Sequence, residues 1–243
     1  MKYLINILRI IVGVVFIISG VVKTIEADFN NDGIKDLVTT RFSDTVIVYL
    51  GSGNGNFYSG SKFFYSTNPI SIEANDFNAD GFQDLAIIGN STNVSILLGL
   101  GTGSFSPEVN YFAGTGPSDI VSSDYNNDGM VDIAVSCTGS NKISVLLGVG
   151  TGSFSNAINY SITSPKSMTK GDFNLDGKMD LAVTNNSVTV LSGLGNGSFS
   201  SSVNYAAGLG PSAIISSDFN NDGKLDLATT NSNSNNVSIL IGY

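Results

Sequence analysis

Short apolar runs alternate along most of the chain with clusters of Gly, Asn, Asp and Ser. The runs are about 4 to 8 residues long and rich in Val and Ile, which is typical of β-strands bounded by turns. Some of them, such as ISVLLG at 143–148, are apolar on both faces, as expected for strands sandwiched between two layers. The pattern therefore predicts an all-β protein made of many short strands.

The same pattern returns about every 48 residues. A nine-residue segment of the form D-x-N-x-D-G-x-x-D recurs with spacings of 48, 48, 48 and 46 residues, and it begins at Asp28, Asp76, Asp124, Asp172 and Asp218. A proline precedes four of the segments, and a glycine turn ending in Phe follows four of them. We therefore expect repeats at 21–68, 69–116, 117–164, 165–210 and 211–243.

Each full repeat contains four apolar runs, which predicts a four-stranded antiparallel sheet. A sheet of that size and repeat length is typical of one blade of a β-propeller. The last repeat stops after its third run, so two arrangements stay open: a five-bladed ring closed by an N-terminal strand, and an incomplete, open piece of a longer array. A calcium-loaded parallel β-helix would need a nine-residue GGxGxDxUx period, which is absent.

The recurring segment places oxygen-bearing side chains at alternating positions, as a Ca²⁺ loop requires. Side chains at positions 1, 3, 5 and 9 and the carbonyl at position 7 would supply the ligands, and the glycine at position 6 permits a sharp turn. The candidate ligands are Asp28, Asn30, Asp32 and Asp36; Asp76, Asn78, Asp80 and Asp84; Asp124, Asn126, Asp128 and Asp132; Asp172, Asn174, Asp176 and Asp180; and Asp218, Asn220, Asp222 and Asp226.

An alternative is that each segment is only a connector in which Asp and Asn bond their own backbone. Five copies with every ligand position filled favour the metal site. Three carboxylates held close together repel by about 1 kcal/mol per pair at 4 Å in water, and a divalent cation removes that repulsion. An EF-hand is not expected, because its loop has about 12 residues, ends in Glu and lies between helices.

The first 20 residues have a different character. Lys2 and Arg9 precede an apolar stretch at 10–22, the arrangement of an export signal. We expect a short apolar helix here, either a cleaved signal peptide or a retained membrane anchor, with the remainder exported. The protein is then secreted, periplasmic or on the cell surface.

The composition limits which partners, catalytic groups and metal sites the chain can have. Fifteen of the 20 acidic side chains belong to the repeated loops, and five bound Ca²⁺ ions would bring the net charge from −9 to +1. Nucleic acid is not an expected partner of so acidic a chain. The absence of His excludes His-dependent triads and His-containing zinc sites. The single cysteine, Cys137, cannot form an internal disulfide and is expected to be a small buried residue.

The loop followed by DLA or DIA and then SILLG or SVLLG resembles the FG-GAP/VCBS repeats of integrin α-subunit propellers and many bacterial surface proteins. The resemblance covers about residues 21–243. It implies a propeller with one Ca²⁺ between the first and second strands of each blade, and it implies no single activity.

We therefore expect an exported calcium-binding scaffold for adhesion or for binding a protein or glycan, with contact to a membrane only through an uncleaved N-terminus. A catalytic site would normally break the symmetry at one blade, and no odd polar cluster stands out, so an enzyme is not expected. The alternative is a Ca²⁺-dependent polysaccharide-active enzyme, or a non-catalytic module of one.

Overall fold

The computed structural model describes residues 7–10, 13–16, 21–41, 44–65, 68–200 and 202–242. In these residues the chain is all-β apart from one short 3-10 turn, η1 (Thr138–Ser140). Blade 1 contains β3 (Val21–Ala27), β4 (Asp36–Arg41), β5 (Thr45–Gly51) and β6 (Phe57–Phe64), and blade 2 contains β7 (Pro69–Asn75), β8 (Asp84–Gly89), β9 (Asn93–Leu97) and β10 (Val109–Phe112).

The other three blades continue the same order. Blade 3 contains β11 (Pro117–Ser123), β12 (Asp132–Cys137), β13 (Lys142–Leu146) and β14 (Ile158–Ser161); blade 4 contains β15 (Met168–Gly171), β16 (Asp180–Thr184), β17 (Val188–Leu191) and β18 (Val203–Tyr205); blade 5 contains β19 (Pro211–Ser217), β20 (Asp226–Asn231) and β21 (Asn236–Leu240). Successive strands within each blade pair antiparallel, as predicted. Blade 5 has three strands in the described residues.

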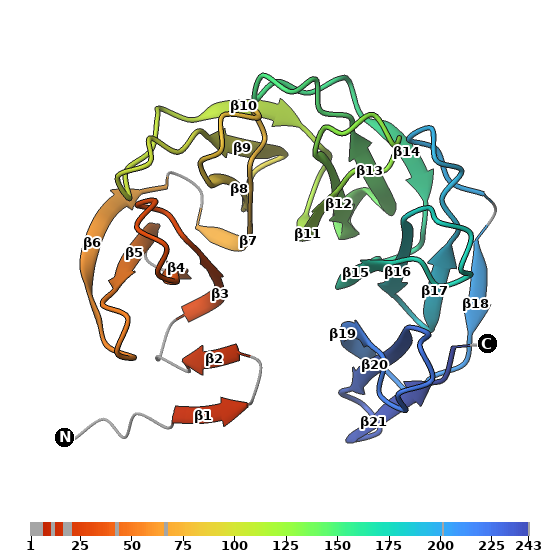
Figure 1. Ribbon diagram of the computed structural model, residues 1–243. Helices are drawn as coiled ribbons and strands as arrows, with labels where there is room; N and C mark the ends of the chain where they lie inside the picture. The colour runs from red at the N-terminus through yellow and green to blue at the C-terminus, as the bar shows by residue number, and fades with distance from the viewer. Residues whose placement is uncertain are drawn as a thin grey trace.

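Figure 1 shows the sheets following one another along an arc, with β3, β7, β11, β15 and β19 toward its centre. The arc is open between blade 5 and the N-terminal strands, so a closed ring is not seen. The predicted architecture of antiparallel blades is confirmed, while closure is not.

The hydrophobic core lies in the seams between blades. Ile88 and Ile96 of blade 2 pack with Ile133 and Val135 of blade 3, and all four are almost completely buried. Burying one such side chain stabilises the fold by about 1.5–3 kcal/mol. Cys137 belongs to the same cluster, which confirms the prediction of a buried residue.

An aromatic side chain closes each of the first three seams. It comes from the glycine turn before a blade's last strand and packs on two aromatic rings of the preceding blade, with ring centroids 5.4–5.9 Å apart. The three sets are Phe105 with Phe29 and Phe63, Phe154 with Phe77 and Tyr111, and Phe199 with Tyr125 and Tyr160. These recurring aromatic residues therefore serve blade packing.

The face of blade 5 that points away from blade 4 differs from the corresponding face of the other blades. Its apolar side chains are exposed where their counterparts in blade 2 are buried: Phe219, Val237 and Ile239 correspond to Phe77, Val94 and Ile96. No further blade covers this face in the part of the chain that the structure describes.

The predicted N-terminal apolar helix is not supported. Within residues 1–20 the structure describes an antiparallel pair, β1 (Ile7–Ile10) with β2 (Gly13–Phe16). Ile and Val are β-branched and favour strands over helices, so the composition of this segment suits strands although its charge and apolar pattern resembles an export signal. The rest of the predicted segment lies outside the described residues. No helix among the described residues is long and apolar enough to cross a membrane.

Candidate functional site

Each D-x-N-x-D-G-x-x-D loop connects the first strand of its blade to the second, for example β11 to β12 in blade 3. Two residues of every loop have a positive φ: in blade 3, Asn127 at 58° and Gly129 at 83°. Asn tolerates this left-handed conformation better than most residues, and Gly adopts it without strain. The predicted sharp turn at the glycine is therefore confirmed.

The first three candidate ligands of a loop fold around the loop's own backbone. Asp124 accepts hydrogen bonds from the amides of Asp128 (3.2 Å) and Gly129 (2.8 Å). Asn126 Oδ1 also accepts from the Asp128 amide, at 3.0 Å, and Asp128 Oδ1 accepts from the Met130 amide at 2.7 Å. The same amide bonds recur in the other four loops.

The ninth position has a different environment. Asp132 is fully buried; its Oδ2 accepts from the Tyr125 amide and its Oδ1 from the Gly148 amide, both at 2.8 Å. The carboxylate thereby joins the start of the loop to the end of β13. Its counterparts Asp36, Asp84, Asp180 and Asp226 make the same pair of bonds.

Burial raises the pKa of Asp132 to about 6, and the carboxylates of Asp128 and Asp124 add to the rise, although the two amide bonds oppose it. The pKa of Asp84 is raised to about 6 for the same reasons. A nearby cation would act in the opposite direction, because it favours the ionised form.

The loop residues fit a hard cation in donor type. Carboxylate, amide and carbonyl oxygens are the ligands that Ca²⁺ prefers. An oxygen that accepts one amide hydrogen bond keeps a second lone pair for a metal, so the bonds of Asp132 do not exclude it as a ligand. Among the described residues, however, no three acidic or cysteine side chains form a preassembled metal cluster. The four candidate ligands of each loop thus stay a prediction.

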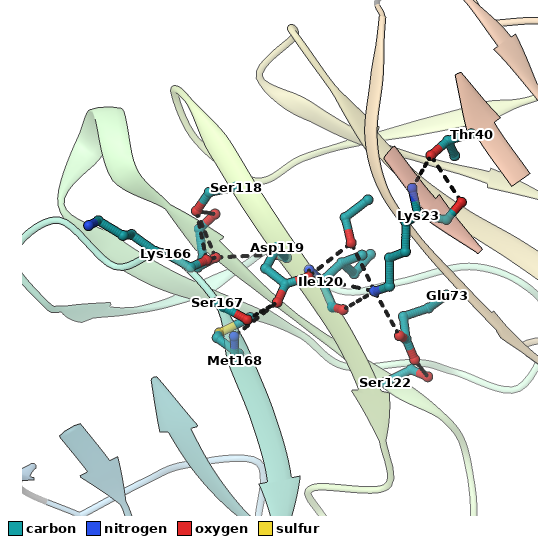
Figure 2. Close-up of polar contacts among 12 residues, drawn as sticks. Lys23, Thr40, Glu73, Ser118, Asp119, Ile120, Ser122, Lys166, Ser167 and Met168 are labelled. Carbon is teal, nitrogen blue, oxygen red and sulfur yellow. Dashed lines mark hydrogen bonds and ion pairs between the residues drawn. The ribbon is translucent and has the colours of Figure 1, made fainter. Parts of the chain in front are cut away.

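A second polar site lies at the centre of the arc and was missed by the sequence analysis. Figure 2 shows Lys23 of β3 reaching toward the inner strands of blades 2 and 3. Its Nζ donates to Ser71 Oγ at 2.9 Å and to Glu73 Oε1 at 3.2 Å, and it lies 3.6 Å from Asp119 Oδ1. One side chain of blade 1 therefore contacts two other blades.

Asp119 is the residue of this cluster that accepts hydrogen bonds from both neighbouring blades. Its Oδ1 accepts from Ser71 Oγ at 2.9 Å, and its Oδ2 accepts from Ser167 Oγ at 3.1 Å and from the Met168 amide at 2.9 Å (Figure 2). It therefore ties blade 3 to both of its neighbours.

The prediction that no odd polar cluster breaks the repeat is wrong. The same position of successive repeats, in or directly before the inner strand, is occupied in turn by Lys23, Ser71, Asp119, Ser167 and Ala213. A change from cation to hydroxyl to carboxylate at one position is not required by blade packing. Aligning the five inner strands position by position would have revealed it.

The cluster borders a shallow cavity of about 250 Å³ lined by residues of the inner strands and the segment before β15, including Lys23, Ser118, Asp119, Lys166, Ser167 and Ser212. Lys166 Nζ points away from Asp119 in Figure 2 and lies 3.4 Å from the carbonyl oxygen of Pro211. No acidic side chain among the described residues forms an ion pair with it. This ammonium group is therefore available to an anionic partner.

Comparison with solved structures finds the same fold in proteins of low identity. The structure of BBS1N in complex with ARL6DN matches at a TM-score of 0.60 and 13% identity, over 93% of this chain and 70% of that one. A functionally unknown protein from Desulfotomaculum acetoxidans DSM 771 matches at 0.59 and 15%, over 92% and 70%. The V. cholerae biofilm matrix protein Bap1 matches at 0.54 and 16%, over 89% and 36%.

No curated protein matches the chain. The family model described as the FG-GAP-like repeat matches it four times in tandem, at residues 28–87, 76–135, 124–183 and 172–229. Each match begins at the first Asp of a loop and extends into the second strand of the next blade. On these matches, which together span most of its length, the chain belongs to the FG-GAP-like repeat family.

Proposed function

We propose that this protein is an exported, non-catalytic scaffold that holds one Ca²⁺ in each of its five loops and binds a ligand through the centre of the arc. The observation that carries the calcium part is the loop itself. Five copies keep the same oxygen-bearing side chains and the same backbone bonds, although nearby positions such as Ala79 and Leu175 vary. The ions would neutralise the loop carboxylates and stabilise the seams beside them.

Calorimetric titration of chelator-treated protein with Ca²⁺ tests this proposal. We expect about five sites per chain and a rise in melting temperature on binding. Asp124→Ala should reduce the stoichiometry by about one, because it removes a ligand from one loop only. Glu108→Ala, which removes an exposed carboxylate outside the loops, should leave the stoichiometry unchanged. A protein that takes up no Ca²⁺ and melts at the same temperature with and without it would contradict the proposal.

The central cavity supports an acidic glycan as the ligand. Lys23 and Lys166 bring two positive charges to the lining of the cavity against the single negative charge of Asp119. The serine hydroxyls around them can exchange hydrogen bonds with sugar hydroxyls, while Lys166 pairs with a carboxylate or sulfate. Extracellular use of this fold is in keeping with the biofilm matrix protein among its structural neighbours.

A glycan array probed with the calcium-loaded protein tests the ligand class. We expect uronate-containing or sulfated glycans to be retained and neutral ones not. Lys166→Ala should weaken retention about tenfold or more, whereas Lys62→Ala, an exposed lysine on the outer strand β6, should not. Binding to proteins but to no glycan would assign the cavity to a protein partner.

The absence of catalysis is part of the proposal. Glu73 and Asp119, the acidic residues of the central cluster, are both held by Lys23 and by serine hydroxyls, so neither is poised as an acid or base. Incubation with acidic polysaccharides should release no product, and turnover lost in Asp119→Asn would refute this part.

Export is proposed from the sequence of residues 1–20. It is checked by fractionating cells that express the whole chain.

A further inference from the structure

A cavity of about 370 Å³ lies between the outer strands β10 and β14, in the seam between blades 2 and 3. Its lining combines aromatic and polar side chains and includes Tyr111, Phe112, Lys142, Ser155, Asn156 and Asn159. A cavity of this volume, with apolar walls and a few polar groups, is typical of a small-ligand site. The two blades that form this seam are both described with all four strands, and Figure 1 shows β10 and β14 on the outer side of the arc.

The apolar wall of the cavity includes an exposed aromatic ring. Phe112 is 63% exposed, more than any other aromatic side chain of the described residues. Its neighbour Tyr111 instead packs on Phe154, with ring centroids 5.4 Å apart. Covering the Phe112 ring with a ligand would be favourable, because it would remove apolar surface from water.

Lys142 of blade 3 is held beside this ring. Its Nζ lies 5.5 Å from the ring centroid of Phe112 and donates to Asn159 Oδ1 at 2.7 Å. A Cβ at Gly114 would lie only 2.6 Å from Lys142 Cε, so the glycine leaves room for the lysine stem. An ammonium group has three donors, and the bond to Asn159 uses one of them. No acidic side chain of the described residues lines the cavity or forms an ion pair with Lys142.

The lysine is a departure from the repeat. In blades 2, 3 and 4, an Asn of the outer strand accepts a hydrogen bond from a hydroxyl of the third strand at 2.6–2.9 Å. Only blade 3 adds a lysine to this pair, because the residues that correspond to Lys142 in the other blades are Thr45, Asn93, Ser187 and Asn236. The other blades pack without a lysine, so blade packing does not require it.

We propose that this cavity binds an acidic sugar residue, with the pyranose ring against Phe112 and the carboxylate paired with Lys142. A pyranose has an apolar C–H face and a rim of hydroxyl groups, which suits an exposed ring beside the amides of Asn156 and Asn159. The charge-assisted bond from Lys142 favours an acidic sugar over a neutral one. A wholly apolar ligand would bury these polar groups without partners. The proposal depends neither on the calcium loops nor on the central cavity.

The chain contains no tryptophan, so Phe112→Trp places a single fluorescent reporter in this cavity. Methyl β-D-glucuronide is titrated into the reporter protein, and the emission is followed. We expect a saturable change, whereas methyl β-D-glucoside, which lacks the carboxylate, should bind about tenfold more weakly. Lys142→Met in the reporter protein should remove this difference. Lys62→Met, which removes an exposed lysine from β6 of blade 1, should leave it unchanged.

The wild-type protein provides a second measurement that needs no variant. In ¹⁵N-labelled protein, the glucuronide should shift the amide resonances of Phe112, Lys142 and Asn159 more than those of Ser187 and Asn204 at the corresponding positions of blade 4. Because both readouts are local to one seam, binding in the central cavity would not produce them. The proposal would be overturned if the glucuronide changed neither the emission nor these resonances, or if Lys142→Met left its affinity unchanged.

Discussion

The buried aspartate at the ninth loop position offers a sharp test of how the blades are held together. Asp132 is fully buried, and its two oxygens accept the amides of Tyr125 and Gly148. Asp132→Ala leaves both donors without a partner, and each orphaned buried donor costs about 1–3 kcal/mol. The expected loss of unfolding free energy is therefore about 2–6 kcal/mol. Asp132→Asn keeps one acceptor oxygen, so it should cost about half as much.

Urea unfolding followed by far-UV circular dichroism, in the presence of a chelator, measures these losses without a contribution from metal binding. Glu108→Gln is the control, because it neutralises an exposed carboxylate and should change the stability by no more than about 0.5 kcal/mol. Stabilities of both Asp132 variants within that margin of the wild type would show that the carboxylate acts only through a metal. The hypothesis that the Asp132 carboxylate itself stabilises the fold by joining the loop to β13 would then be refuted.

Three further predictions concern the backbone and the central cluster. Leu175 is exposed at a φ of 60°, where three of the other four loops have Asn and one has Ala. Leu175→Asn should therefore stabilise the protein by about 1 kcal/mol and Asn127→Leu should destabilise it similarly, both read from urea midpoints. A Cβ at Gly148 would lie 2.2 Å from a backbone oxygen, whereas one at Gly129 meets nothing within 4 Å and is strained only by the φ of 83°. Gly148→Ala should therefore lower the melting temperature more than Gly129→Ala. Lys23→Met should cost about 1–2 kcal/mol at low salt and less at high salt, because the ion pairs it removes are partly exposed.

Much of the fold could be predicted because the repeat presents the same local signals several times. The run ISVLLG was expected to be apolar on both faces, and residues 143–146 of β13 are all buried between blades 2 and 4. The resemblance to FG-GAP/VCBS repeats implied that the loops lie between the first and second strands of each blade, and the structure has them there. Closure could not be predicted, because it depends on contacts between the ends of the array that no local pattern encodes.

The central cluster was missed for a physical reason as well. Lys23, Ser71 and Asp119 look like ordinary solvent-facing residues when each strand is taken alone, and they come together only because the inner strands converge. The N-terminal segment departs from its prediction for another reason. Its run of Ile and Val suits an export signal and a strand equally well, and β1 and β2 show that the strand geometry is compatible with it.

The aromatic residues that close the seams between blades impose an order on the folding of the protein. Phe105 lies 76 residues after Phe29, whose seam it closes, and Phe154 lies 77 residues after Phe77. During synthesis a blade therefore emerges from the ribosome well before the residue that locks it to its neighbour, and each seam waits for the following blade's glycine turn. Because chains are made from the N-terminus, the seams should close in order, with the newest blade always the loosest. A stalled ribosome would hold a chain whose last seam is still open to the solvent.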